Sequence, residues 1–114
     1  MSHINHQVIR HKLGEMARRV ESTHAWIEQL AYQYQCGESD SKSLGGAIAL
    51  MKVHATKNFE FCAREASQIL GGSSYVREGK GQMIERLYRE VRVSAIGGGS
   101  EEVLMDMAVR QAKL

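Results

Sequence analysis

The sequence predicts an all-α domain, built as an up-down bundle of two long and two short helices. Apolar residues recur every three or four positions over two stretches of about thirty residues, which is the pattern of one face of an α-helix. The 114 residues include no proline, so nothing interrupts long helices. Valine and isoleucine never alternate with polar residues in the runs that indicate strands. This length predicts one domain, residues 1–114, with a single modest core.

The first predicted helix spans about residues 5–36, and Gly37 ends it. On its polar side Glu15 stands at helical spacing from Arg18 and Arg19, so ion pairs are expected there. Its apolar face steps by three, four or seven positions along Ile9, Leu13, Met16, Val20, Ile27, Leu30 and Tyr34.

The second predicted helix follows a polar turn, residues 38–41, with Asp40 or Ser41 as its N-cap, and runs to about Leu70. Gly45 and Gly46 in its first turn disfavour helix, and they indicate either a close packing contact or a frayed start. Its apolar stripe consists of Leu44, Ile48, Met51, Ala55, Phe59, Cys62, Ala66 and Ile69.

Two glycine turns bracket the short third helix. Gly71-Gly72 is expected to stop the second helix, because glycine adopts the left-handed conformation without a Cβ clash. Residues 73–82 read as a loop and residues 83–94 as a helix with Glu85–Arg89 and Arg86–Glu90 pairs on its polar face. Gly97-Gly98-Gly99 then precedes Ser100, the expected N-cap of a last helix over residues 101–113.

Composition excludes several classes of function. The formal net charge is +2 and basic residues are interleaved with acidic ones, whereas nucleic-acid binding needs a clustered basic face. No apolar run approaches the ~20 residues needed to cross a bilayer, and no signal-peptide pattern opens the chain. Cys36 and Cys62 are isolated thiols, which suit a reducing compartment and small core or boundary positions. We therefore expect a cytoplasmic protein, or one of the mitochondrial matrix in a eukaryote, that binds neither nucleic acid nor membrane.

No constellation of catalytic or metal-binding residues is recognisable. His3 and His6 can share a helical face but no carboxylate completes a metal site, and His24 and His54 fall in different helices. The Gly79-Lys80-Gly81 segment lacks the preceding strand, the glycine spacing and the following Ser or Thr of a phosphate loop. No Ser or Cys has the flanking signature of an activated nucleophile.

The glycine turns admit two interpretations. Glycines beside a helix end let backbone N–H groups approach an anionic ligand, so phosphate or nucleotide contact is one. Simple helix termination is the other. Gln68 lies near the end of the second helix, just before its final apolar pair. Its side chain can contact a ligand, or it can equally be a solvated or C-capping amide.

Three motifs, in this order and spacing, resemble the C-terminal helical domain of the acyl-CoA dehydrogenase family. They are Gln68-Ile69-Leu70-Gly71-Gly72-x-x-Tyr75, Glu85-Arg86-Leu87-Tyr88-Arg89-Glu90 and Ile96-Gly97-Gly98-Gly99-Ser100-Glu101-Glu102-Val103. The segment from His6 to Met16 is also similar to the start of that domain's second helix. The resemblance covers nearly the whole chain.

The resemblance implies a part of a flavoprotein that introduces a double bond between Cα and Cβ of an acyl-CoA thioester. Members assemble as dimers or tetramers, with FAD lying between domains and touching a neighbouring subunit. On this basis Gln68, Gly71 and Gly72 match residues that contact the partner subunit's FAD, His6 and Gln7 match a pair near its adenosine, and Ser100 and Glu102 match the FAD contacts of the final turn.

The departures from the family pattern matter equally. Many members carry their catalytic glutamate in the final glycine turn, where this chain has Gly98, and a subset supplies it from an earlier helix that would precede Met1. The Arg-x-x-Phe-Gly motif that binds FAD phosphate and the first helix of the bundle are also missing, and the 78–82 loop is longer than usual. The resemblance therefore implies no catalytic residue in this chain.

The leading interpretation is an oxidoreductase domain, the C-terminal domain of an FAD-dependent acyl-CoA dehydrogenase, that oligomerises through its helices. As an isolated chain it is expected to bind no FAD and to be inactive. The alternative is a stand-alone helical oligomerisation module without enzymatic activity, and a third is an independent nucleotide-binding bundle. Acyl chain length cannot be predicted, because the family's acyl pocket lies mostly outside this part of the subunit.

Overall fold

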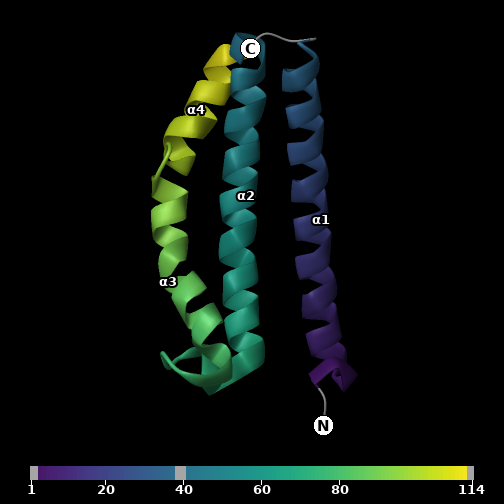
Figure 1. The fold of residues 1–114 in the computed structure, drawn as a ribbon, viewed down its shortest axis with the longest axis vertical. Coiled ribbons are helices and arrows are strands. Elements are labelled where there is room, and N and C mark those ends of the chain that lie inside the picture. The colour runs from purple at the N-terminus through teal and green to yellow at the C-terminus, as the bar shows by residue number, and fades with distance from the viewer. Residues whose placement is uncertain (1–2, 38–40, 113–114) are drawn as a thin grey trace.

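The computed structural model describes residues 3–37 and 41–112, and within these ranges the chain is entirely helical. The α-helices are α1 (Gln7–Cys36), α2 (Ser41–Leu70), α3 (Gln82–Ile96) and α4 (Glu101–Gln111). Short 3₁₀ turns, η1 (His3–Asn5), η2 (Gly71–Ser74) and η3 (Gly79–Gly81), connect or precede them. The predicted fold class, two long and two short helices in an up-down order, is confirmed (Figure 1).

The helix ends lie close to their predicted positions where a local signal sets them. Gly37 caps α1 in the left-handed conformation, with φ 66°. Ser100 caps α4, its Oγ accepting a hydrogen bond from the Val103 amide at 3.5 Å. α2 begins at Ser41, while Asp40, the other N-cap candidate, and Lys113, the expected end of α4, lie outside the described residues. The predicted 73–82 loop is more regular than expected, because it contains η3 and the second half of η2.

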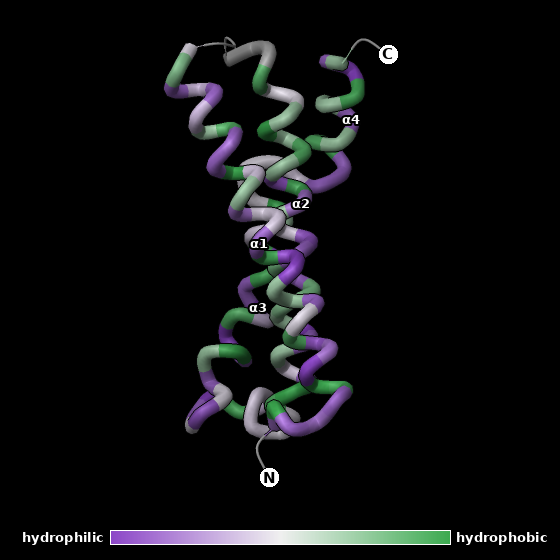
Figure 2. Tube along the Cα trace, turned by 90° about the vertical axis from the view of Figure 1, so that its right-hand side faces the viewer, coloured by the Kyte–Doolittle hydropathy of each residue, from purple (hydrophilic) through white to green (hydrophobic). Residues whose placement is uncertain are grey.

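α2 is the middle element of a twisted layer of helices. α1 lies along one side of it, and α3 followed by α4 lies along the other (Figure 1). Helices that overlap at mid-height diverge toward both ends when the layer is viewed from the side (Figure 2). Within the described residues neither α3 nor α4 packs substantially against α1. Every helix therefore depends on α2 for its packing.

The core of this layer is small. Its buried apolar members are Leu30, Leu44, Ala49, Val53, Ala63, Val91, Ala95 and Ala108, four of which are alanines. Large apolar side chains remain exposed on α1, where Val20 is 55% and Ile27 42% exposed. Cys36 is exposed as well, so its prediction as a core or boundary residue is wrong: it occupies the last, unpacked turn of α1. Cys62 is half-buried, as predicted.

Polar contacts align α1 with α2. The Lys12 ammonium lies 2.9 Å from the buried Glu65 carboxylate. Further along, Arg19 Nη1 donates to Asn58 Oδ1 at 3.0 Å, and Asn58 Nδ2 donates to Thr23 Oγ1 at 2.9 Å. Because these partners are specific and lie at two separate points, they fix the relative register of the two long helices.

Glycines allow the closest approaches on the other side of α2. A Cβ built on Gly45 would lie 3.0 Å from Gln111 Oε1, and one on Gly46 would lie 3.6 Å from the Ala108 carbonyl oxygen. Of the two interpretations of Gly45 and Gly46, close packing is the one observed, and α4 is the packing partner. A Cβ on Gly81 would meet the Ser73 carbonyl oxygen at 2.1 Å, so η2 and η3 touch through their backbones.

The predicted ion pairs on the helix surfaces are confirmed. Glu15 pairs with Arg18 and Arg19, and Glu85 pairs with Arg89. Arg86 and Glu90 form the third predicted pair, at 3.9 Å. In the part of the chain that the structure describes, no helix is both long and apolar enough to cross a membrane.

Candidate functional site

The first candidate ligand contact is the turn that ends α2. Gly71 has φ 61°, which only glycine adopts without strain, and this explains its identity. Gly72 does not have a positive φ, and a Cβ built on it would have nothing within 4 Å. Both glycines are exposed. The chain itself therefore explains Gly71 but not Gly72, whose open surface permits close approach by a ligand or a partner.

A buried serine holds this turn in shape. Ser74 is 6% exposed, and its Oγ lies 2.8 Å from the Gly71 carbonyl oxygen and 3.0 Å from that of Ser67. The Ser67 hydroxyl is 2.8 Å from the same Oγ. A buried hydroxyl with several partners makes a rigid support. The exposed backbone of Gly71 and Gly72 is thus presented by a fixed turn.

Five of the seven predicted cofactor contacts meet at this end of the molecule. Gln68 is exposed on the last turn of α2, and His6 and Gln7 are exposed at the start of α1, which lies at the same end (Figure 1). The Lys12–Glu65 ion pair links the two helices nearby. We call Gln68, Gly71, Gly72, His6 and Gln7 the first group.

The remaining two residues, Ser100 and Glu102, form a second group at the junction of α3 and α4. Gly98 and Gly99 precede them with φ 73° and 112°, so this turn requires glycine at both positions. Glu102 is exposed in the first turn of α4. Its neighbour Glu101 instead faces α2, where the Thr56 hydroxyl donates to its carboxylate at 3.5 Å.

The two groups lie well apart. Gln68 follows Thr56 by 12 positions on α2, which corresponds to ~18 Å at the helical rise of ~1.5 Å per residue. A single ring system cannot touch both groups. Ligands at both groups would have to be distant parts of one extended molecule or two separate molecules.

Charged side chains next to the first group are engaged with one another. Arg89 donates two hydrogen bonds to Glu85, at 2.6 and 3.1 Å, and these lower the pKa of that carboxyl group. Arg77 lies 3.7 Å from the same carboxylate. Glu85 is therefore a charged structural partner and lacks the raised pKa of a general base near neutral pH.

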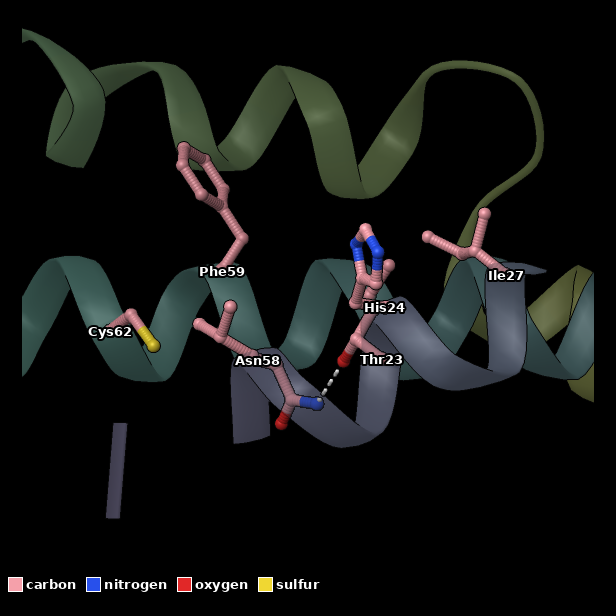
Figure 3. Close-up of a pocket in the computed structure, with 8 residues that line it drawn as sticks. Thr23, His24, Ile27, Asn58, Phe59 and Cys62 are labelled. Carbon is pink, nitrogen blue, oxygen red and sulfur yellow. Dashed lines mark hydrogen bonds between the residues drawn. The ribbon is translucent and has the colours of Figure 1, made fainter. Parts of the chain in front are cut away.

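A separate apolar pocket lies between α1 and α2 and was not predicted as a site (Figure 3). Its lining residues are Val20, Thr23, His24, Ile27, Ala55, Asn58, Phe59 and Cys62. Burial raises the pKa of the Cys62 thiol, which disfavours the nucleophilic thiolate. The sequence contained a signal for this pocket, because five of these residues belong to the two predicted apolar stripes.

Two of the five histidines, His24 and His54, have side-chain partners in the protein. His24 Nε2 lies 2.8 Å from Glu28 Oε1, and both side chains are mostly exposed. His54 Nε2 accepts a hydrogen bond from Asn58 Nδ2 at 3.0 Å, and its ring meets Trp26 edge-on. Within residues 3–37 and 41–112 no cluster of three or more His, Cys, Asp or Glu side chains could hold a metal ion.

The residues present fit the periphery of a dinucleotide. The first group offers amide side chains and an exposed glycine backbone with room for close approach at Gly72. The second group offers the uncompensated N–H groups at the start of α4 and the Ser100 hydroxyl, which makes only a long capping bond of 3.5 Å. Groups of this kind can bind phosphate and ribose oxygens.

The chain resembles known proteins over nearly its whole length. The family model described as "Acyl-CoA dehydrogenase, C-terminal domain" matches residues 2–113. The chain is 43% identical over 113 residues to the acyl-CoA dehydrogenase AFT10-1 of Alternaria alternata, covering 95% of this chain and 26% of that protein. It is 35% identical over 106 residues to the acyl-CoA dehydrogenase apdG of Emericella nidulans, covering 91% and 24%.

A more distant relative is the mitochondrial long-chain specific acyl-CoA dehydrogenase of Mus musculus, 28% identical over 105 residues, covering 92% of this chain and 23% of that protein. The chain thus spans about a quarter of the length of the curated relatives it matches. No solved structure matches it significantly.

Proposed function

Because this chain belongs to the acyl-CoA dehydrogenase family, as its C-terminal helical domain, we propose that it serves in the α,β-dehydrogenation of acyl-CoA thioesters by contributing the outer contacts of an FAD site. The observation that carries the proposal is the exposed turn at Gly71 and Gly72, where the fold requires glycine at position 71 but leaves an open glycine surface at Gly72 that it does not require.

We propose that the two groups contact different flavins in an assembled oligomer. The separation along α2 is compatible with this, because the first group lies too far from Ser100 and Glu102 to hold the same ring. The family resemblance assigns the first group to the flavin of a partner subunit. Each copy of the domain would then support its own cofactor and that of its neighbour.

Flavin, when bound, supplies the acceptor for the hydride that leaves Cβ of the substrate. The residues of this chain bind and orient. Gln68 and the Gly71–Gly72 backbone present hydrogen-bonding groups to one cofactor, and the Ser100 hydroxyl and the start of α4 present theirs to another. Neither Glu101, which is turned toward Thr56 on α2, nor the exposed Glu102 is assigned as the base that removes a proton from Cα.

A base for the reaction must therefore come from outside the described residues. Gly98, at the family's glutamate position, offers only backbone, and Glu101 is turned toward Thr56 on α2. We propose that the isolated chain is inactive and binds no FAD by itself. A yellow purified chain, or reduction of an electron-accepting dye with a saturated acyl-CoA, would contradict this.

A chimera tests the positive part of the proposal. Replacing the C-terminal quarter of the Alternaria relative with this chain should give a flavoprotein that retains FAD through gel filtration. The matched control replaces the same quarter with this chain carrying Gln68→Ala and Gly72→Ala, which should fold but retain less FAD. A well-folded wild-type chimera without FAD, while the parent enzyme holds it, would refute the flavin-binding role.

A second candidate function is a helical oligomerisation module without a catalytic role. The apolar pocket between α1 and α2 favours it, because Val20 and Ile27, which line it, are largely exposed and Phe59 is only half-buried. Exposed apolar patches of this kind mark interaction sites. Both candidate functions predict an oligomer, and light scattering that shows a monomer at tens of micromolar would count against both. Retention of FAD by the chimera separates them.

A further inference from the structure

Lys52 on α2 reaches the turn between α3 and α4. Its Nζ donates to the Ser94 carbonyl oxygen at 2.9 Å and to the Gly99 carbonyl oxygen at 3.0 Å. These two acceptors lie 42 and 47 positions from Lys52 in the sequence, and they belong to two different segments. One ammonium group therefore joins the end of α3 to the last glycine before α4.

The Ser94 carbonyl is one of the groups that a helix end leaves without a partner. Carbonyls of the last turn of an α-helix find no amide within the helix, and positive side chains near that end both bond to them and favour the helix dipole. α3 has no basic residue of its own in its last turn. Lys52 supplies that charge from a neighbouring helix.

The Gly99 carbonyl belongs to a turn that has few other restraints. Gly98 and Gly99 have φ values of 73° and 112°. Glycine loses more conformational freedom on folding than any other residue. One helical turn after Lys52, Thr56 holds Glu101 through a long bond of 3.5 Å. The hydrogen bonds that Lys52 makes to this turn are thus shorter than the bond from Thr56 to Glu101.

We propose that Lys52 is a positioning residue: its ammonium group, bonded to the Ser94 and Gly99 carbonyls, fixes the α3–α4 turn and thereby the places of Ser100 and Glu102. This inference rests on the proposed function only for what Ser100 and Glu102 contact. The geometric part stands on the two hydrogen bonds and can be tested without flavin.

Amide hydrogen exchange of the full 114-residue chain, followed by NMR, tests the geometric part. Lys52→Met keeps the length of the stem but removes both hydrogen bonds. The amides of Val103 and Leu104, which bond to Ser100, should exchange at least about tenfold faster, corresponding to ~1.4 kcal/mol, while amides in the middle of α1 keep their wild-type rates. Lys52→Arg, which can donate to both carbonyls, should restore slow exchange.

Lys57→Met is the matched control, since Lys57 is exposed on the same helix and makes no hydrogen bond or ion pair within the part of the chain that the structure describes. It should leave all these rates unchanged. Wild-type exchange at Val103 and Leu104 in Lys52→Met would overturn the proposal. So would an equal acceleration along the whole chain, because that would show a contribution to global stability alone. If Lys52→Met does not fold, Lys52→Gln, which can donate to one carbonyl, takes its place with the same criteria.

The functional part is tested in the chimera. Lys52→Met should weaken FAD binding at least about fivefold with the Lys57→Met control unchanged, and Lys52→Arg should recover it. If the wild-type chimera itself binds no FAD, the proposed function fails and the exchange experiment still decides the role of Lys52. If exchange at the turn accelerates but FAD affinity does not change, Lys52 positions the turn without serving the cofactor, and the contact of Ser100 and Glu102 with the cofactor is refuted.

Discussion

Gly72→Ala is the substitution that best separates a ligand role from a folding role at the end of α2. Gly72 lacks a positive φ, and an added Cβ would find nothing within 4 Å. The folded chain can therefore accept the methyl group. Because alanine loses less backbone freedom on folding, the substitution should stabilise the chain by about 0.4–1 kcal/mol. In contrast, Gly71→Ala forces a side chain onto φ 61° and should destabilise it by ~1–2 kcal/mol.

The assay has two parts. Urea unfolding of the isolated variants, followed by circular dichroism at the helix band, gives the free energies of unfolding. FAD titration of the chimera carrying the same substitutions gives affinity, and Gly72→Ala should weaken it about tenfold or more, because the methyl group occupies the space through which the cofactor approaches the backbone.

Gly14→Ala is the matched control. Gly14 is exposed within α1, and a Cβ there would also find nothing within 4 Å. Alanine in this helix interior should stabilise the chain by about 1 kcal/mol and leave FAD affinity unchanged. If Gly72→Ala folds as expected and binds FAD as well as the wild type does, the exposed glycine has no role in flavin contact, and the observation that carries the proposed function is lost.

Three further outcomes are expected. Asn58→Ala should lower the free energy of unfolding by about 2–3 kcal/mol, because it removes a buried amide from Arg19 and Thr23; a loss below ~0.5 kcal/mol in urea unfolding would contradict this. The hydrogen bond from Lys12 holds the pKa of Glu65 below its ordinary value of 4.5, so the stability it contributes is present above that value and is lost as the pH falls through the folded-state pKa. The melting temperature of the wild type should therefore fall between about pH 5 and 3. The Glu65→Gln variant should be less stable at neutral pH, and its melting temperature should change less over this range. Equal changes in the two proteins would refute a stabilising role of the Glu65 carboxylate. Gly98→Glu should create no dye reduction by acyl-CoA in the isolated chain, because no flavin is positioned there, and any such reduction would disprove the view that this domain needs the rest of the subunit.

The helices could be predicted from the sequence because their limits are set locally. Gly37 adopts the left-handed conformation that ends α1, and the Ser100 hydroxyl accepts a hydrogen bond from the Val103 amide at the start of α4. The apolar repeat spans whole helices, so it survives small errors at either end. α3 exceeded its predicted limits by one residue at the start and two at the end, because neither Gly81 nor Gly97 provides a side-chain cap.

The arrangement of the helices could not be predicted in the same way. Periodicity shows that a helix has an apolar face but does not identify its neighbour, so the central place of α2 and the exposure of Cys36 had no sequence signal. The bonds from Lys52 also escaped prediction, since they join residues more than forty positions apart. The family motifs predict the two groups of cofactor contacts, whereas their separation along α2 emerged only from the packing of Thr56 against Glu101.

The same arrangement explains why both proposed roles depend on neighbouring protein. One side of α2 makes the polar contacts with α1. The opposite side, rich in alanine and glycine, packs closely against α3 and α4. The apolar stripe of α2 falls between these two sides, so Phe59 and its neighbours line an open pocket instead of a closed core (Figure 3). Both groups of cofactor contacts are likewise on the surface of the layer. A ligand held only by Gly71 and Gly72, or only by Ser100 and Glu102, would remain largely in solvent, whereas ligand sites usually bury most of their ligand. Binding at either group therefore requires a second protein surface opposite it, and this is why flavin retention should appear in the chimera and not in the isolated chain.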